Sequence, residues 1–441
     1  MPMKRDEPAL AYSVLRRSVK RVLWVLTGWL WVSTASAAVI VVQPGQRIQA
    51  AIDQAAPGDT VEVQRGRYIE NLRIDKRITL RGIDRPTVSG GEQGDTIRVI
   101  ASDVAIEGMI VSDSGPSLLN QNAGIYVQPG AHRARVQNCF LSYNLFGLWI
   151  EKADDVQVLN NNITGKRDFD SAQRGNGVQL YNTKGARIIG NEISFVRDAL
   201  YIDVSHHAVF QKNRMHHSRY GTHYMNSYYN LWEDNDTWDN RGGLALMEVR
   251  NQEIRNNRAW RNSDHGIMLR TLQDAVIENN VVMNNGRGLF IYDVEYTRLI
   301  GNVVADNQIG VHLSGSPRNE VSDNDFIENR EQIRYAGTRD IEWGGGKGNY
   351  WSNYRGWDRD GDGRGDIPYE ANDVVDRLTW RYPSVRLLMA SPAVQALRMV
   401  GQQFPVLRVP SVVEKHPRML PRSTDWARWR ERLNKDLQRA P

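Results

Sequence analysis

The sequence predicts an all-β fold, namely a right-handed parallel β-helix with coils of about 22 residues. Short strands of the form Gly-x-x-apolar recur at intervals of 22 or 23 residues, apart from one interval of 30. They begin at Gly124, Gly147, Gly177, Ala199, Gly221, Gly243, Gly266, Gly288 and Gly310. Two or three short strands with their turns fill such a coil, which leaves no room for a helix of about 12 residues. Each repeat therefore predicts one coil of a solenoid.

A ladder of asparagines has the same spacing and the same long interval, around residues 164–176. Its members are Asn138, Asn161, Asn191, Asn213, Asn235, Asn257, Asn279, Asn302 and Asn324. Asparagine tolerates left-handed backbone, and its amide can bond to the amide of the next coil, so we expect a structural ladder at the coil corners. Cys139 is the only cysteine, which excludes a disulfide within the chain; we expect a small buried side chain there.

The ends of a solenoid need cover, because the terminal coils expose unpaired strands and apolar interior. Apolar spacing in residues 48–55 predicts an amphipathic capping helix, which leads to the first coils at residues 61–63. We predict a β-helix over residues 38–345, an aromatic and Asp-rich capping segment over 346–370, and a basic tail over 371–441.

Residues 1–37 have the features of a secretory signal peptide. Basic residues precede an apolar run over residues 22–32, and small residues follow at 35–37. We predict cleavage after Ala37 and export to the periplasm. The run is too short for a transmembrane helix, which needs about 20 apolar residues.

The net charge of +5 does not indicate nucleic-acid binding. Six basic and two acidic residues in the signal peptide account for four of the five charges. Residues 371–441 carry thirteen basic and six acidic residues, so the preceding solenoid is acidic. We predict that this tail docks on another protein or on a membrane surface; folding back on the solenoid is the alternative.

One outward face of the solenoid is rich in aromatic residues and methionine. In the strand 221–225 the second and fourth side chains should point inward, and the third and fifth outward. Outward positions include a candidate binding set of Tyr126, Trp149, Tyr201, Phe290 and Tyr292. Exposed apolar patches commonly mark binding surfaces.

The same face brings together His223, Met225, Met247 and Met268 on neighbouring strands. Thioethers and an imidazole are soft ligands that suit Cu(I) and suit Mg²⁺ or Ca²⁺ poorly. We predict a copper(I) site there; packing is the alternative. A second histidine-rich zone, residues 206–207 with 215–217, could bind metal, take part in catalysis or lie in solvated turns.

Residues 358–366 hold the sharpest local motif, an Asp-rich loop. Asp358, Asp360, Asp362 and Asp366 occupy loop positions 1, 3, 5 and 9, as in a Ca²⁺ loop of the EF-hand type. Position 12 is Tyr369, and no helix pattern flanks the loop. A calcium site and a metal-free acidic turn are both open.

The segment 348–354, of sequence Gly-Asn-Tyr-Trp-Ser-Asn-Tyr, followed by the Asp-rich loop, resembles the C-terminal part of the NosD family, periplasmic maturation factors of nitrous oxide reductase. The opening, residues 43–71, is also similar, and the resemblance covers about residues 40–400. It implies an accessory role, without catalysis, in assembling the copper–sulfur centre of the reductase. The implied partners are an ABC-type ATPase and permease (NosF and NosY), reached through the C-terminal tail, the copper chaperone NosL and the reductase itself. Contact with the membrane would run only through the permease.

The competing function is a periplasmic polysaccharide lyase, hydrolase or uronate epimerase on the same solenoid. Outward aromatics could stack on sugars, and Asp264-His265 offers an acid–base pair. A polyuronate site should also present several basic residues, and the two outward columns from residue 126 to 314 contain only Arg270. A plain scaffold or surface adhesin is a further alternative.

Overall fold

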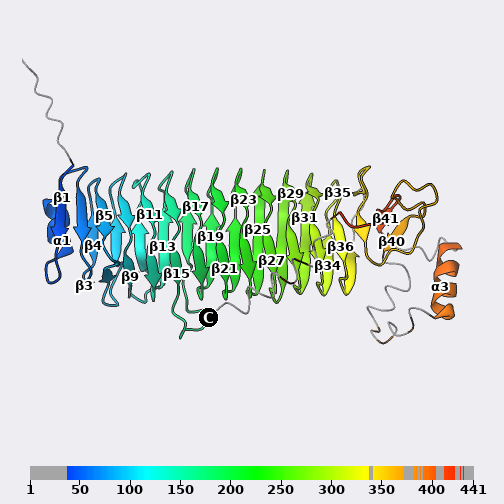
Figure 1. The fold of residues 1–441 in the computed structure, drawn as a ribbon, viewed down its shortest axis with the longest axis horizontal. Coiled ribbons are helices and arrows are strands. Elements are labelled where there is room, and N and C mark those ends of the chain that lie inside the picture. The colour runs from blue at the N-terminus through cyan, green and yellow to red at the C-terminus, as the bar shows by residue number, and fades with distance from the viewer. Residues whose placement is uncertain are drawn as a thin grey trace, which may run out of the picture. The chain divides into compact units, whose positions relative to one another are not determined.

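The computed structural model describes residues 37–336, 341–371, 391–403 and 412–422, and the single residues 382, 384, 388, 428 and 431. Residues 37–336 and 341–351 form a right-handed parallel β-helix, the predicted fold, whose coils stack along one axis and whose three parallel sheets run along that axis (Figure 1). Each full coil gives one strand to each sheet. Residues 1–36 lie outside the described residues, so the signal peptide stays a prediction.

The strands are short because each coil must turn three times. Sheet A has 14 strands: β1 Val39–Val42, β2 Thr60–Val63, β5 Thr79–Gly82, β8 Ala105–Glu107, β11 Arg135–Gln137, β14 Gln157–Leu159, β17 Arg187–Ile189, β20 Val209–Gln211, β23 Leu231–Glu233, β26 Glu253–Arg255, β29 Val276–Glu278, β32 Arg298–Ile300, β35 Glu320–Ser322 and β38 Glu342–Trp343. Sheet B has 13 strands: β3 Arg67–Ile69, β6 Thr87–Ser89, β9 Ile110–Ser112, β12 Phe140–Ser142, β15 Asn162–Thr164, β18 Glu192–Ser194, β21 Arg214–His216, β24 Asp236–Trp238, β27 Arg258–Trp260, β30 Val281–Met283, β33 Val303–Ala305, β36 Asp325–Ile327 and β39 Tyr350–Trp351. Sheet C has 12 strands: β4 Leu72–Ile74, β7 Ile97–Val99, β10 Ala123–Val127, β13 Phe146–Glu151, β16 Val178–Tyr181, β19 Asp198–Asp203, β22 Tyr220–Met225, β25 Gly242–Arg250, β28 His265–Gln273, β31 Arg287–Glu295, β34 Ile309–Ser314 and β37 Glu331–Ala336.

The side-chain directions predicted for the strand 221–225 are confirmed. Thr222 and Tyr224 are fully buried and face the core, whereas His223 and Met225 lie on the outside and are half-buried. Leu, Ile and Val from all three sheets fill the interior, so one continuous core runs along the coils.

The asparagine ladder is structural, with two shifts from the predicted positions. Asn257 donates from Nδ2 to the Trp232 carbonyl at 2.9 Å and to Asn280 Oδ1 at 3.0 Å. In that coil the ladder residue is therefore Asn280, and Asn279 takes the left-handed corner before it. At the start, Cys139 occupies the ladder position and Asn138 the corner. Cys139 is fully buried, and burial raises the pKa of its thiol to about 11.

The N-terminal cap is the helix α1, Ile48–Gln54, as predicted. Its buried residues Ile48, Ala51 and Ile52 join the core. The Glu70 carboxylate accepts hydrogen bonds from the backbone N–H groups of Ile48 and Gln49, at 2.8 and 3.2 Å. A carboxylate placed there satisfies N–H groups that the helix itself leaves free.

The C-terminal cap comes from the segment predicted to be a docking tail. Strand β41, Val412–Glu414, pairs antiparallel with β40, Tyr369–Ala371. The buried Glu414 carboxylate accepts hydrogen bonds from the Asn349 backbone N–H at 2.5 Å and from Trp351 Nε1 at 2.7 Å. Residues 412–422 thus form part of the solenoid cap, because they satisfy polar groups that the last coil would leave bare.

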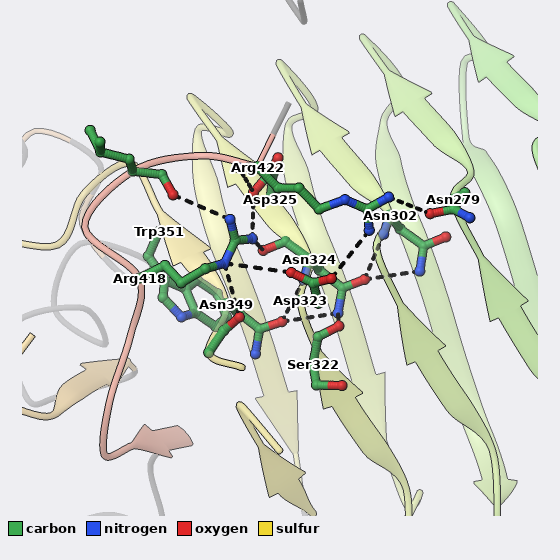
Figure 2. A network of polar contacts seen from close by, with 12 residues as sticks. Asn279, Asn302, Ser322, Asp323, Asn324, Asp325, Asn349, Trp351, Arg418 and Arg422 are labelled. Atoms are coloured by element: carbon green, nitrogen blue, oxygen red, sulfur yellow. Dashed lines mark hydrogen bonds and ion pairs between the residues drawn. The ribbon is translucent and has the colours of Figure 1, made fainter. Parts of the chain in front are cut away.

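Two arginines extend this cap along the last coils (Figure 2). Arg418 donates to the buried Asp325 carboxylate at 2.7 Å and to the Gly348 carbonyl at 3.1 Å. Arg422 donates from its backbone N–H to Asp325 at 3.0 Å and from its guanidinium to Asn279 Oδ1 at 2.8 Å. The basic residues of this segment neutralise acids of the solenoid.

The remaining described element of the tail is the helix α3, Pro392–Gln403, where residues 393–400 are predicted to be helical. Its Leu397 and Val400 are exposed. Among the described residues, no helix is long and apolar enough to cross a membrane.

Candidate metal site on the outer face of sheet C

The strand register of sheet C brings the four predicted copper ligands into one patch, which we call the Met/His patch: His223, Met225, Met247 and Met268. Met225 on β22 lies directly beside Met247 on β25. Ala245 lies between His223 on one side and Met268 on the other. All four side chains face outward and are partly or largely buried.

His223 is oriented by a carboxylate from the preceding coil. Its Nδ1 lies 3.2 Å from Asp198 Oδ2 and 3.2 Å from the Arg219 guanidinium. Asp198 is fully buried and also receives two hydrogen bonds from Arg219, at 2.8 and 2.5 Å. When Nδ1 carries the proton it donates to Asp198, which leaves Nε2 as the ligand atom. Histidines that bind metal usually have such a partner on the second nitrogen.

The charge on Asp198 is stabilised although the side chain is buried. Burial by itself raises the pKa of this carboxyl, but hydrogen bonds from His223 and Arg219 outweigh it and hold the pKa below its usual value. The buried acid and the arginine therefore form a neutral pair beneath the imidazole. Tyr201 and Tyr220 pack against the imidazole ring of His223, with distances between ring centroids of 4.8 and 5.6 Å.

A second histidine, His265, lies beside Tyr220 next to this patch, and from the sequence it offers only an acid–base pair with Asp264. It is 1% exposed, and neither ring nitrogen has a hydrogen-bond partner among the described residues. Its Nδ1 is 3.6 Å from Asp264, and burial lowers its pKa. A Cβ on Gly242 would lie 2.4 Å from His265 Nε2, so only glycine leaves room for this ring. A neutral buried imidazole without a hydrogen bond is a second candidate ligand.

The five aromatic residues predicted for binding all lie on this outer face, but in two groups. Tyr126 and Trp149 stack at 6.5 Å, and Tyr126 donates to Glu151 at 2.8 Å. Further along are Tyr201, beside His223, and Phe290 with Tyr292 on β31. Tyr126 is only 8% exposed and Tyr292 is 46% exposed, so the face is uneven in its access to solvent.

The outer face of sheet C carries more basic residues than the sequence predicts. The two outward columns contain only Arg270. Arg98, Arg219, Arg287 and Arg334 also reach this face, from strands or strand starts that these columns leave out. Each pairs with an acid of the same face: Asp95, Asp198, Asp264 and Glu331, respectively. The contact with His265 and the ion pair with Arg287 together lower the pKa of the Asp264 carboxyl, although burial opposes the shift.

The second histidine zone does not form one site. His206 and His207 lie at the corner between sheets C and A, and stack on Tyr228 and Tyr229 of the next coil. His216 is the last residue of β21, where it contacts Glu192 at 3.1 Å, and His217 lies at the corner that follows. A metal shared by one histidine of each pair is therefore not supported.

The Asp-rich loop brings three of its four predicted ligands together. Carboxylate oxygens of Asp358, Asp360 and Asp362 lie within 4.8 Å of one another. Both oxygens of Asp358 already accept backbone N–H groups, from Gly361 and Gly363, and Asp366 accepts one from Arg359. Both the calcium site and the metal-free turn are compatible with this geometry.

Comparison with known proteins identifies the family. Residues 159–356 match a family model described as periplasmic copper-binding protein (NosD). The chain is 36% identical over 371 residues to a probable ABC transporter binding protein NosD of Stutzerimonas stutzeri, covering 80% of this chain and 85% of that protein. It is 38% identical over 370 residues to the protein of the same name from Pseudomonas aeruginosa, covering 80% and 86%. The chain belongs to the NosD family.

Solved structures with the same fold are far more distant in sequence. The A-module of an Azotobacter vinelandii mannuronan C-5 epimerase superposes with a TM-score of 0.56 at 15% identity, over 67% of this chain and 93% of the module. A Yersinia enterocolitica family 28 exopolygalacturonase gives 0.53 at 10% identity, over 70% and 78%. At these identities the likeness concerns the β-helix alone.

Proposed function

We propose that this NosD protein is a periplasmic accessory factor without catalytic activity that binds copper(I) as cargo at the Met/His patch. In this proposal it supports assembly of the copper–sulfur centre of nitrous oxide reductase. The observation that carries the proposal is His223, which a buried aspartate holds through one nitrogen, two residues before Met225 on a strand where Met225 is in register with Met247. A soft ligand set with an oriented imidazole suits Cu(I).

The test is a competition titration with a Cu(I) chelator on the exported full-length protein. We expect Met225→Leu with Met247→Leu to weaken Cu(I) binding at least about tenfold, or ~1.4 kcal/mol. Leucine has nearly the volume of methionine, so the fold should change in stability by less than about 1.5 kcal/mol. Met283→Leu is the matched control, because Met283 lies on the outer face of sheet B, away from the patch.

His265→Phe separates the two histidines as ligands. A loss of affinity in His265→Phe, with none in the double methionine variant, would move the site to His265 and contradict the proposed patch. If all variants bind Cu(I) as tightly as the wild type, the copper site does not lie on this face.

We propose partners for the same role: the ABC-type ATPase and permease NosF and NosY, the copper chaperone NosL and the reductase. The names of the two relatives support a transporter system. Since residues 412–422 belong to the cap, we place docking on the permease in residues 372–411, which include the exposed Leu397 and Val400 of α3. Leu397→Glu with Val400→Glu should abolish co-purification of the permease from membranes. Val413→Glu, at the exposed middle position of β41, should not.

The enzymatic alternative is less well supported. A polyuronate site needs free basic residues, and the arginines at 98, 219, 287 and 334 are each paired with an acid. Lyase or epimerase assays on alginate and polygalacturonate, with Asp264→Asn as the control, are expected to show no turnover. Turnover that disappears in this variant would overturn the proposal.

A further inference from the structure

Two histidines that are adjacent in the chain, His216 and His217, direct their Nδ1 atoms at each other at the corner between sheets B and C. The two Nδ1 atoms are 2.7 Å apart, and the ring planes meet at 82°. His216 ends β21 with its side chain on the outer face of sheet B, and His217 has the left-handed backbone of the corner, with a φ of 53°. In a continuing strand, adjacent side chains would point to opposite faces. The corner instead turns the second ring back toward the first.

Stacking on neighbouring coils holds both imidazole rings in place. His216 stacks on Trp238 of the next coil, with ring centroids 4.3 Å apart, and Trp238 stacks in turn on Trp260 at 5.0 Å. His217 stacks on Phe195 of the preceding coil at 5.0 Å. The two Nδ1 atoms are therefore brought together by packed side chains, which is the preorganisation that a binding site requires.

Glu192 determines which nitrogen of His216 carries the proton. Its Oε1 lies 3.1 Å from His216 Nε2, and an ionised carboxylate can only accept. The hydrogen bond from His216, together with the nearby Arg214, lowers the pKa of this carboxyl, although burial opposes the shift. The proton of neutral His216 is thus on Nε2, and Nδ1 presents a lone pair toward His217. A carboxylate on the second nitrogen is the usual support of a histidine that binds metal.

The distance between the two Nδ1 atoms indicates the geometry of the ion that fits them. Metal–nitrogen bonds of about 2.0 to 2.1 Å place two ligand atoms about 2.9 Å apart when the bonds meet at a right angle. A tetrahedral ion with the same bonds needs about 3.3 Å, and two ligands on opposite sides of an ion need about 4 Å. The observed 2.7 Å is nearest to the right angle, which occurs in square-planar and tetragonal sites of Cu²⁺ and Ni²⁺.

We infer that His216 and His217 chelate a divalent cation of square-planar or tetragonal preference through their Nδ1 atoms, with Cu²⁺ as the strongest binder. Affinity of nitrogen ligands for divalent ions of this series is highest for Cu²⁺. Water completes the coordination, because in the part of the chain that the structure describes no third His, Cys, Asp or Glu converges on the pair. His217 is exposed, so the ion has access from solvent. The site does not use the Met/His patch and does not depend on the copper(I) proposal.

His206 and His207 form an adjacent pair without this geometry. His206 Nδ1 accepts the backbone N–H of Tyr228 at 3.0 Å, so this nitrogen is already occupied. The two rings stack separately on Tyr228 and Tyr229, at 5.0 and 5.1 Å. Adjacency in the chain is therefore not sufficient for chelation. His207→Phe, which keeps a ring against Tyr229, is the matched control.

Titration of the exported full-length protein with Cu²⁺, monitored by electron paramagnetic resonance without reductant, tests the site. We expect the most tightly bound ion to show nitrogen hyperfine splitting from two imidazoles. His217→Phe should weaken Cu²⁺ binding at least tenfold and remove this splitting. Phenylalanine keeps the stacking and suits the corner backbone, since Phe195 has a φ of 55° at the equivalent position of the preceding coil. His216→Phe should have the same effect, and circular dichroism melting checks that both variants fold.

The controls separate this site from the copper(I) proposal. His207→Phe, and Met225→Leu with Met247→Leu, should bind Cu²⁺ as tightly as the wild type. Equal affinity in the wild type and His217→Phe overturns the inference and leaves the pair as a hydrogen bond between two imidazoles. A loss in the double methionine variant without a loss in His217→Phe assigns Cu²⁺ to the Met/His patch and also overturns it. Displacement of Cu²⁺ by an equal concentration of Zn²⁺ would contradict the square-planar or tetragonal geometry.

Discussion

The outer faces of sheets B and C have the same strand geometry and similar residues, yet they differ in access to solvent. Both carry aromatic residues and methionines at outward positions. On sheet B they stack on one another and are nearly inaccessible, and on sheet C they alternate with charged and histidine residues that remain partly open. A side chain that points away from the core is therefore not always exposed. Only a partly exposed methionine near an oriented histidine is placed to bind a metal ion.

Truncation of one aromatic side chain on each face gives the largest expected contrast. Trp260→Ala should lower the free energy of unfolding by about 3 kcal/mol, because it leaves a cavity in a packed cluster. Phe290→Ala removes a partly exposed ring and should cost about 1 kcal/mol. Urea denaturation monitored by circular dichroism measures both. Equal losses would mean that the two faces are packed alike.

Acid should weaken the outer face of sheet C through His312, which lies in its outward column beside Phe290. Burial, together with Arg334 and Arg287, lowers the pKa of His312 to about 4. The unfolded chain binds this proton at pH values below about 6.5, so His312 makes the fold less stable as the pH falls from 6.5 toward 4.

Between pH 7 and 4.5 the free energy of unfolding should fall by about 1 to 2 kcal/mol more in the wild type than in His312→Phe. This figure allows for the partial exposure of the ring. Phenylalanine keeps the stacking on Phe290, whose ring lies 5.1 Å from that of His312. Urea unfolding at the two pH values measures the difference. Met283→Leu, on sheet B, should lose as much stability as the wild type over this pH range. An equal loss in His312→Phe would show that His312 does not cause the pH dependence.

The smallest expected effect concerns metal selectivity. If the Asp-rich loop binds Ca²⁺, millimolar Ca²⁺ should raise the melting temperature by a few degrees, and Asp360→Asn with Asp362→Asn should abolish the rise. The Met/His patch should not respond to Ca²⁺, because its ligands are soft. A chelator that leaves the melting temperature of the wild type unchanged would make the loop a metal-free turn.

The sequence by itself determined the periodic features of this protein. Equal spacing of glycines and asparagines gave the solenoid, the inward and outward directions and the register that aligns Met225 with Met247, because every coil repeats one geometry. Spacing did not resolve shifts of one residue. Asn279 and Asn280 are adjacent asparagines, and only the hydrogen bonds show which one joins the ladder.

Tertiary structure alone decided what covers each surface. The contacts of Glu414 with Trp351 and of Arg422 with Asn279 join residues 63 and 143 positions apart and follow no repeat, so the cap formed by residues 412–422 could not be derived from spacing. Asp198 and Arg219 lie within the repeat, one coil apart, but spacing alone does not show that they pair beneath His223 or that the nitrogens of His265 are orphaned. Periodicity fixes the direction of a side chain from the local backbone, whereas its burial and its charge pairing depend on the neighbours that the three-dimensional fold brings to it.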